Sequence, residues 1–106
     1  MSNPKGLAEL MRQAQIMQKK IQRVQEEMSE RTAEGEAGGG MVKATANGKN
    51  QLVALKIEKE AVDIEDLSML EDLVVAAANV ALKKAQEMLN EEMSKVTGGM
   101  QIPGLF

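Results

Sequence analysis

Few residues in this 106-residue chain have side chains that could catalyse a reaction. It contains no cysteine and no histidine, which removes disulfides, thiolate nucleophiles, Cys-based zinc sites and the commonest general base. The acidic pairs Glu71-Asp72 and Glu91-Glu92 remain, but neighbours in a helix point about 100° apart and are poor partners in acid–base catalysis. A solvated helix face is the better interpretation. We expect no enzyme activity, catalytic residue, metal site, cofactor or small-molecule substrate.

Two features of nucleotide-binding and RNA-binding sites are also missing. Gly38-Gly39-Gly40 is followed neither by a lysine and Ser/Thr pair at P-loop spacing nor by a helical pattern, so a flexible turn is preferred to a phosphate loop. Phe106 is the only aromatic residue, which leaves no platform for stacking unpaired bases. Sequence-specific RNA binding is therefore disfavoured.

The basic residues are concentrated near the N-terminus. Residues 1–25 hold five of them against Glu9 alone, a net charge of +4. Because the whole chain carries −3, with a pI of about 5.0, residues 26–106 carry −7. An acidic average thus conceals a basic segment that could attract phosphate groups.

A heptad repeat organises this basic segment into a helix of about residues 4–30. Its a and d positions are all apolar and form what we call the apolar seam: Leu7, Leu10, Ala14, Met17, Ile21, Val24 and Met28. The next d position is Arg31, where the helical pattern ends. A helix of this length spans about 40 Å, against a radius of gyration of about 13 Å for a compact domain of this size. The helix must project or lie along a partner, and the seam could pair with the chain's own C-terminal helix or with a second copy.

Opposite the seam, the same heptad predicts a line of positive charge. Lys5, Arg12 and Lys19 share the f position at intervals of about 10.5 Å, with Lys20 and Arg23 beside them. We call these five residues the basic stripe. They could contact DNA phosphates without reading sequence, although basic residues on a solvent-facing helix are often only solubilising.

The middle of the chain predicts strands at about 31–37, 41–47 and 51–58, the first only weakly signalled by its own residues. Val42, Ala44 and Ala46 alternate with Lys43 and Thr45. In the next strand, Val53, Leu55 and Ile57 alternate with Ala54 and Lys56. Asn47-Gly48 favours a type I′ hairpin turn. A four-residue loop would place Val42 opposite Leu55 and Ala44 opposite Val53, and it is preferred to a two-residue loop that would place Ala44 opposite Gln51.

A second long helix is predicted over about residues 66–97, followed by a tail at 98–106. Asp66 or Ser68 could be its N-cap, the latter in a capping box with Glu71. Its apolar stripe is rich in alanine, which would let another backbone approach closely. Gly98-Gly99 is expected to end this helix. The nine methionines are interpreted mainly as adaptable core and seam filling.

The whole chain therefore predicts one α+β domain over residues 1–106. No apolar run approaches the roughly 18 residues that a membrane span needs, and the N-terminus lacks the apolar region of a secretory signal. We expect a cytoplasmic protein that does not associate with membranes.

Five segments, taken together in order and spacing, resemble the YbaB/EbfC family of bacterial nucleoid-associated proteins across the whole chain. They are 10–15 (LMRQAQ), 35–42 (GEAGGGMV), 47–48 (NG), 69–77 (MLEDLVVAA) and 97–104 (TGGMQIPG). The resemblance implies an α-β-β-β-α fold with a three-stranded antiparallel sheet, in a homodimer whose paired helices extend like tweezers around double-stranded DNA. It also implies low sequence specificity, a location in the nucleoid, and roles in nucleoid organisation and gene regulation.

The resemblance supplies no position-by-position DNA-binding motif, so the basic stripe is inferred from charge and period alone. The acidic residues Glu26, Glu27 and Glu30 in the distal part of the helix predict weak binding that is very sensitive to salt. The alternative is a homodimeric protein-interaction module with no physiological DNA binding, in which the seam and the methionine-rich surfaces serve a partner.

Overall fold

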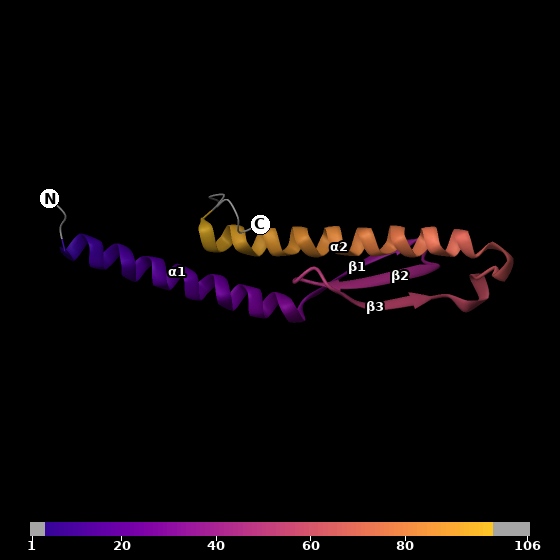
Figure 1. The fold of residues 1–106 in the computed structure, drawn as a ribbon, viewed down its shortest axis with the longest axis horizontal. Coiled ribbons are helices and arrows are strands. Elements are labelled where there is room, and N and C mark those ends of the chain that lie inside the picture. The colour runs from indigo at the N-terminus through magenta and orange to yellow at the C-terminus, as the bar shows by residue number, and fades with distance from the viewer. Residues whose placement is uncertain (1–3, 99–106) are drawn as a thin grey trace.

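The computed structural model describes residues 4–98 and contains two long helices and a three-stranded sheet (Figure 1). In chain order the elements are α1 (Pro4–Glu30), β1 (Thr32–Ala37), β2 (Val42–Asn47), β3 (Leu52–Ile57), the short 3-10 turns η1 (Lys59–Ala61) and η2 (Ile64–Asp66), and α2 (Leu67–Thr97). The sheet is antiparallel with the order β1-β2-β3. The predicted α+β class and order of helices and strands are confirmed. The sequence pattern did not predict the two 3-10 turns, and the predicted tail lies outside the described residues apart from Gly98.

Both ends of α2 are capped by side-chain or backbone groups. Asp66 is the N-cap, and its Oδ1 accepts hydrogen bonds from the backbone N–H of Met69 at 3.3 Å and from the Ser68 hydroxyl at 3.1 Å. Of the two predicted starts, the structure therefore selects Asp66 and not the Ser68 capping box. At the other end Gly98 has a φ of 66° and donates to the Ser94 carbonyl, the left-handed C-cap that glycine favours.

The predicted register of the second hairpin is wrong. Val42 pairs with Ile57 and Ala44 with Leu55, but Ala46 pairs with Leu52, so Val53 is an extra residue in a β-bulge. Neither the four-residue nor the two-residue loop matches this pairing.

The connecting loop also differs from the predicted type I′ turn. The Asn47 side chain accepts hydrogen bonds from the N–H groups of Lys49 and Gln51 at 2.9 and 3.1 Å. Asn50, and not the Asn47-Gly48 pair, takes the positive φ, at 60°. These bonds hold a wider loop than the Asn47-Gly48 dipeptide favours, since an asparagine side chain can replace a backbone partner in a turn.

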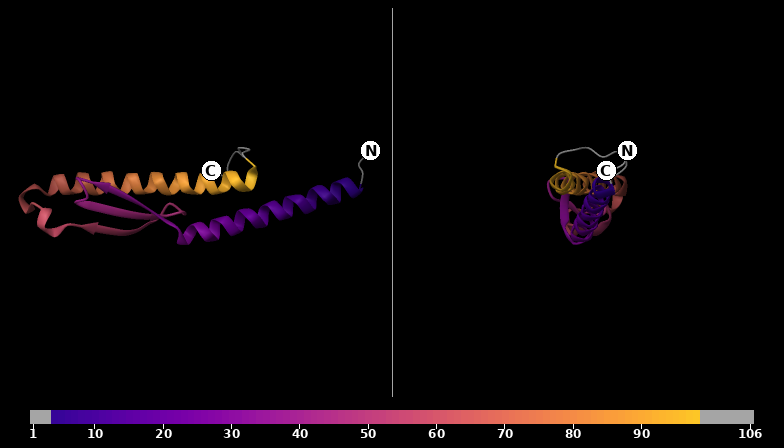
Figure 2. Two further views of the ribbon diagram at one scale, coloured as in Figure 1. Left: turned by 180° about the vertical axis from the view of Figure 1, so that it is seen from behind. Right: turned by 90° about the vertical axis from the view of Figure 1, so that its left-hand side faces the viewer.

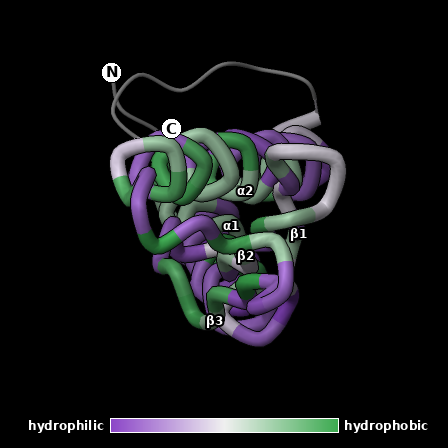
Figure 3. The backbone as a smooth tube through the Cα atoms, turned by 90° about the vertical axis from the view of Figure 1, so that its right-hand side faces the viewer, coloured by the Kyte–Doolittle hydropathy of each residue, from purple (hydrophilic) through white to green (hydrophobic). Residues whose placement is uncertain are grey.

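The end-on view shows β1 and β2 nearer to α2 than β3 (Figure 3), and the core lies between α2 and these two strands. Its fully buried residues are small: Val42, Ala44 and Ala46 from β2 and Ala77, Ala81 and Ala85 from α2. At Gly35 in β1 the approach is so close that an added Cβ would overlap the Ala77 carbonyl oxygen and the Ala81 nitrogen. The alanine stripe thus permits the close backbone approach that was predicted for it.

Strand β3 is less covered than its alternating pattern suggested. Leu52, Val53 and Leu55, which we call the β3 strip, are 49%, 53% and 48% exposed, although Leu55 pairs with the fully buried Ala44. The reason is that α2 packs mainly over β1 and β2 and has few contacts with β3. An apolar edge of the sheet is left open in the single chain.

The molecule is elongated because α1 does not fold back along its full length. Its principal extents are 75 × 21 × 16 Å and its radius of gyration is 20.2 Å, against about 13 Å for a compact domain of this size. Figure 2 shows the N-terminal part of α1 extending beyond the C-terminal end of α2. Of the two predicted arrangements, projection describes the N-terminal half of α1. Within residues 4–98, no helix is long and apolar enough to cross a membrane.

Candidate nucleic-acid interface

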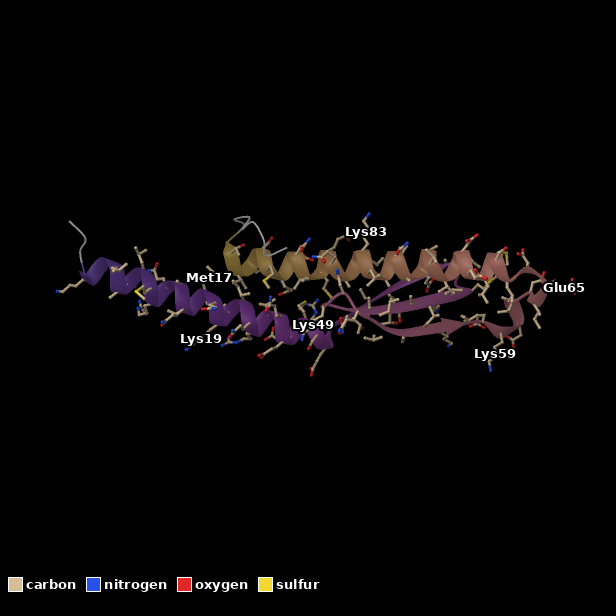
Figure 4. The ribbon with its side chains drawn as sticks, viewed as in Figure 1. Met17, Lys19, Lys49, Lys59, Glu65 and Lys83 are labelled. Atoms are coloured by element: carbon tan, nitrogen blue, oxygen red, sulfur yellow. The ribbon has the colours of Figure 1, made fainter. Side chains whose placement is uncertain are left out.

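Helix α1 carries the basic stripe over its projecting half and into the part that lies beside α2. All five residues are exposed: Lys5, Arg12, Lys19, Lys20 and Arg23. In Figure 4, Lys19 extends from the side of α1 that faces away from α2, whereas Met17 of the apolar seam lies on the side toward α2. Lys19 and Met17 therefore lie on opposite sides of the helix, as their heptad positions require.

The apolar seam changes from exposed to buried along the helix. Leu7 and Leu10 near the N-terminus are 56% and 65% exposed, Met17, Ile21 and Val24 are half-buried, and Met28 is 1% exposed. The C-terminal part packs against the chain's own α2 and β2. The N-terminal part leaves large apolar side chains in contact with water.

The buried end of the seam fixes the position of α1. The Gly48 N–H in the β2–β3 loop donates to the carbonyls of Met28 and Arg31, at 2.8 and 3.1 Å, and so satisfies carbonyls at the C-terminal end of the helix. A Cβ on Gly48 would lie 2.5 Å from both the Cβ and the carbonyl oxygen of Met28. We call this contact between Gly48 and Met28 the helix seat.

An ion pair reinforces the connection between the two helices. Glu92 of α2 lies 3.2 Å from the Arg31 guanidinium, just after α1, and 3.0 Å from the Lys95 ammonium. Lys95 and then Arg31 lower the pKa of the Glu92 carboxyl, so this carboxylate is charged at neutral pH and links α2 to the end of α1.

Two residues of the basic stripe lie beside the C-terminal turns of α2. Lys20 and Arg23 line a shallow cleft with Val24 of α1 and with Glu92, Lys95 and Val96 of α2. Lys95 thus joins the positive surface of α1, although it is 70 residues or more away in sequence. The sequence pattern does not single out Lys95; its place in the last turn of α2, where cations are favoured, is the only local signal.

Within the basic stripe, a carboxylate holds the guanidinium of Arg12. Its Nη2 and Nε donate to the two carboxylate oxygens of Glu9, at 2.6 and 3.1 Å. These bonds lower the pKa of Glu9, and the carboxylate in turn raises the pKa of Arg12. Both partners are therefore charged at neutral pH.

The other candidate sites from the sequence do not assemble into one. Glu71, Asp72 and Glu91 are exposed, and residues 4–98 contain no group of three or more acidic side chains placed to hold a metal ion. Gly38, Gly39 and Gly40 all have positive φ and form the turn from β1 into β2, whereas a phosphate loop leads into a helix.

The sequence of this chain is similar to those of known proteins over nearly its whole length. A model of the YbaB/EbfC DNA-binding family matches residues 3–100. The chain is 51% identical over 101 residues to a nucleoid-associated protein of Pelotomaculum thermopropionicum, covering 95% of this chain and 96% of that protein. It is 55% identical over 97 residues to nucleoid-associated protein TTE0040 of Caldanaerobacter subterraneus subsp. tengcongensis, covering 92% and 87%.

A solved structure is similar as well. The crystal structure of the uncharacterized protein HP0035 from Helicobacter pylori matches with a TM-score of 0.61 and 26% identity, over 74% of this chain and 90% of that one. The chain belongs to the YbaB/EbfC DNA-binding family. The predicted family is confirmed, and DNA binding, not enzyme activity, is what this family is named for.

The helix seat predicts that Gly48→Ala will displace α1. The chain lacks cysteine, so spin labels can be attached at Gln13→Cys and Lys83→Cys without background, with labelled protein diluted into unlabelled protein. The clash with Met28 should shift the distance distribution between the labels by several ångström and broaden it. Lys49→Ala is the matched control, because this exposed neighbour lies in the same loop and its replacement leaves the Gly48 hydrogen bonds to Met28 and Arg31 in place. An unchanged distribution in Gly48→Ala would show that the seat does not fix the helix.

Proposed function

We propose that this protein binds double-stranded DNA as a homodimer, largely through phosphate contacts of the basic stripe and with low sequence specificity. The observation that carries the proposal is the placement of five exposed basic residues on a helix that projects from an otherwise acidic molecule. A projecting helix can follow a duplex without collision with the acidic body. The positive charge is thus presented where a phosphate backbone can reach it.

The chemistry of the stripe favours contacts to phosphates over contacts to bases. Lysine and arginine side chains on an exposed helix face neutralise phosphates and release counterions from DNA whatever the base sequence. The sequence has no tryptophan, no tyrosine and a single phenylalanine, so aromatic wedges and stacking platforms contribute little. Affinity that comes from phosphates alone gives low specificity.

The open apolar surfaces support a homodimer. The β3 strip and the N-terminal seam residues Leu7 and Leu10 are about half exposed or more, and contiguous apolar surface of this kind usually marks an interface. Homo-oligomers most often form two-fold dimers, in which the same patch on each copy meets its counterpart. Dimerisation through the β3 strip would leave the two α1 helices as paired arms, the tweezer-like arrangement that the resemblance implies.

The names of the relatives suggest where this activity takes place. The two relatives described above are called nucleoid-associated proteins. We propose that this chain likewise acts in the cytoplasm on nucleoid DNA, where a phosphate-binding dimer of low specificity would help to organise the chromosome and influence the transcription of many genes. The basic stripe supports this role because it requires no particular DNA site.

Replacement of the basic stripe tests the DNA contact. A variant with Lys5, Arg12, Lys19, Lys20 and Arg23 all changed to glutamine should bind duplex DNA about 100-fold or more weakly at 50 mM salt in a gel-shift titration. The control changes Lys49, Lys56, Lys59, Lys83 and Lys84 to glutamine, which removes the same charge from the body of the molecule. Sizing chromatography checks that both variants keep the wild-type assembly.

Three outcomes of this titration are informative. Loss of binding in the stripe variant alone supports the proposal. Binding that survives in the stripe variant refutes the site. A wild-type protein that fails to bind duplex DNA even at low salt would favour the protein-interaction module, which the exposed Leu7, Leu10 and Met11 could serve.

A charge in the β3 strip tests the dimer. Leu55→Asp should convert the protein to monomers in sedimentation equilibrium, because a carboxylate would be buried without a partner in the interface, while the circular dichroism of the protomer stays unchanged. Ala54→Asp adds the same charge next to it, on a residue that pairs with Thr45 and points to the opposite face of the sheet. That control should remain dimeric. Monomers in both variants, or in neither, would place the interface elsewhere.

A further inference from the structure

The ion pair between Glu9 and Arg12 lies in the middle of the surface proposed to meet DNA. Glu9 is the only acidic residue among the first 25, and it occupies the Nε and Nη2 edge of the guanidinium with both of its oxygens. Gln13 adds a third hydrogen bond to the same carboxylate at 3.4 Å. The acidic group is therefore oriented toward Arg12 by two neighbours one turn along the helix.

A DNA phosphate can reach Arg12 in two ways, and Glu9 opposes both. The phosphate can replace the carboxylate on the occupied edge, which breaks the existing bidentate contact, the strongest geometry for a guanidinium and an oxyanion. It can instead bind the remaining edge, where it lies close to a second negative charge and is repelled. In either case Arg12 contributes less than an unpaired arginine at that position would.

We infer that Glu9 lowers the DNA affinity of this protein, because its carboxylate competes with the phosphate backbone for Arg12. The inference rests on the proposed function and identifies a residue that sets its strength. Each Glu9–Arg12 pair is close to neutral, so it releases fewer counterions than its arginine alone. Glu9 lowers both the affinity of the dimer and the steepness of its salt dependence.

Glu9→Gln tests this inference through two independent readouts. Affinity for a duplex of random sequence, measured by fluorescence anisotropy at 50 mM salt, should rise by about three- to tenfold. The slope of log K against log salt should become steeper by about 1 to 2 for a dimer, because one more cation per protomer is available to phosphates. In an Arg12→Gln background the same change should lose most of both effects.

Glu65→Gln is the matched control. It removes one exposed carboxylate at the end of the 75 Å molecule opposite the N-terminal part of α1 (Figure 4), where screening separates it from the basic stripe. Measured at the same 50 mM salt, it should leave affinity and slope close to wild type. Circular dichroism and sedimentation verify that helix content and assembly are unchanged in every variant.

The outcomes distinguish the inference from the function it rests on. Wild-type protein that binds no duplex at low salt contradicts the proposed function itself. Wild-type binding with no gain in Glu9→Gln overturns the inference alone. An equal gain in Glu65→Gln, or an undiminished gain in the Arg12→Gln background, also overturns it, because Glu9 would then act only through net charge.

Discussion

The contact between Gly48 and Met28 is the constraint on which the use of α1 depends. The Gly48 N–H bonds to the carbonyls of Met28 and Arg31, and no larger residue fits between the loop and the helix. Met28 is buried there, and the Arg31–Glu92 ion pair holds the same end of the helix to α2. Because only this end of α1 is held, the rest of the helix can leave the body and carry its charge outward.

Charge and apolar surface are distributed along α1 so that one helix can have two uses. Lys19 of the basic stripe and Met17 of the apolar seam lie on opposite sides of α1 (Figure 4), and the seam itself is buried only near the helix seat. The acidic body would repel DNA, but at physiological salt its field decays over about 8 Å, which is less than the roughly 20 Å spanned by the N-terminal half of α1. A protein with a negative net charge can therefore present a locally positive surface to DNA.

The helices and strands were predictable because each has a local signal. The heptad of α1, the alternation in β2 and the glycine stop after α2 need no information from other parts of the chain. The register of the second hairpin did not follow, because it depends on a bulge at Val53 and on the hydrogen bonds of the Asn47 side chain. The contribution of Lys95 to the positive surface and the exposure of Leu55 depend on how α2 lies relative to α1 and β3. The spacing of apolar residues in the sequence gives no information about that arrangement. The basic stripe was predicted as a face of a helix, but its Glu9–Arg12 pair required side-chain geometry.

The salt dependence of duplex binding tests the central claim most directly, namely that the basic stripe of a dimer holds DNA by its phosphates. If the wild-type dimer neutralises about six phosphates, log K should fall with log salt at a slope of roughly −5, from about −0.9 per contact. Duplexes of unrelated sequence should give the same slope. An affinity that hardly changes between 50 and 200 mM salt would contradict the electrostatic account.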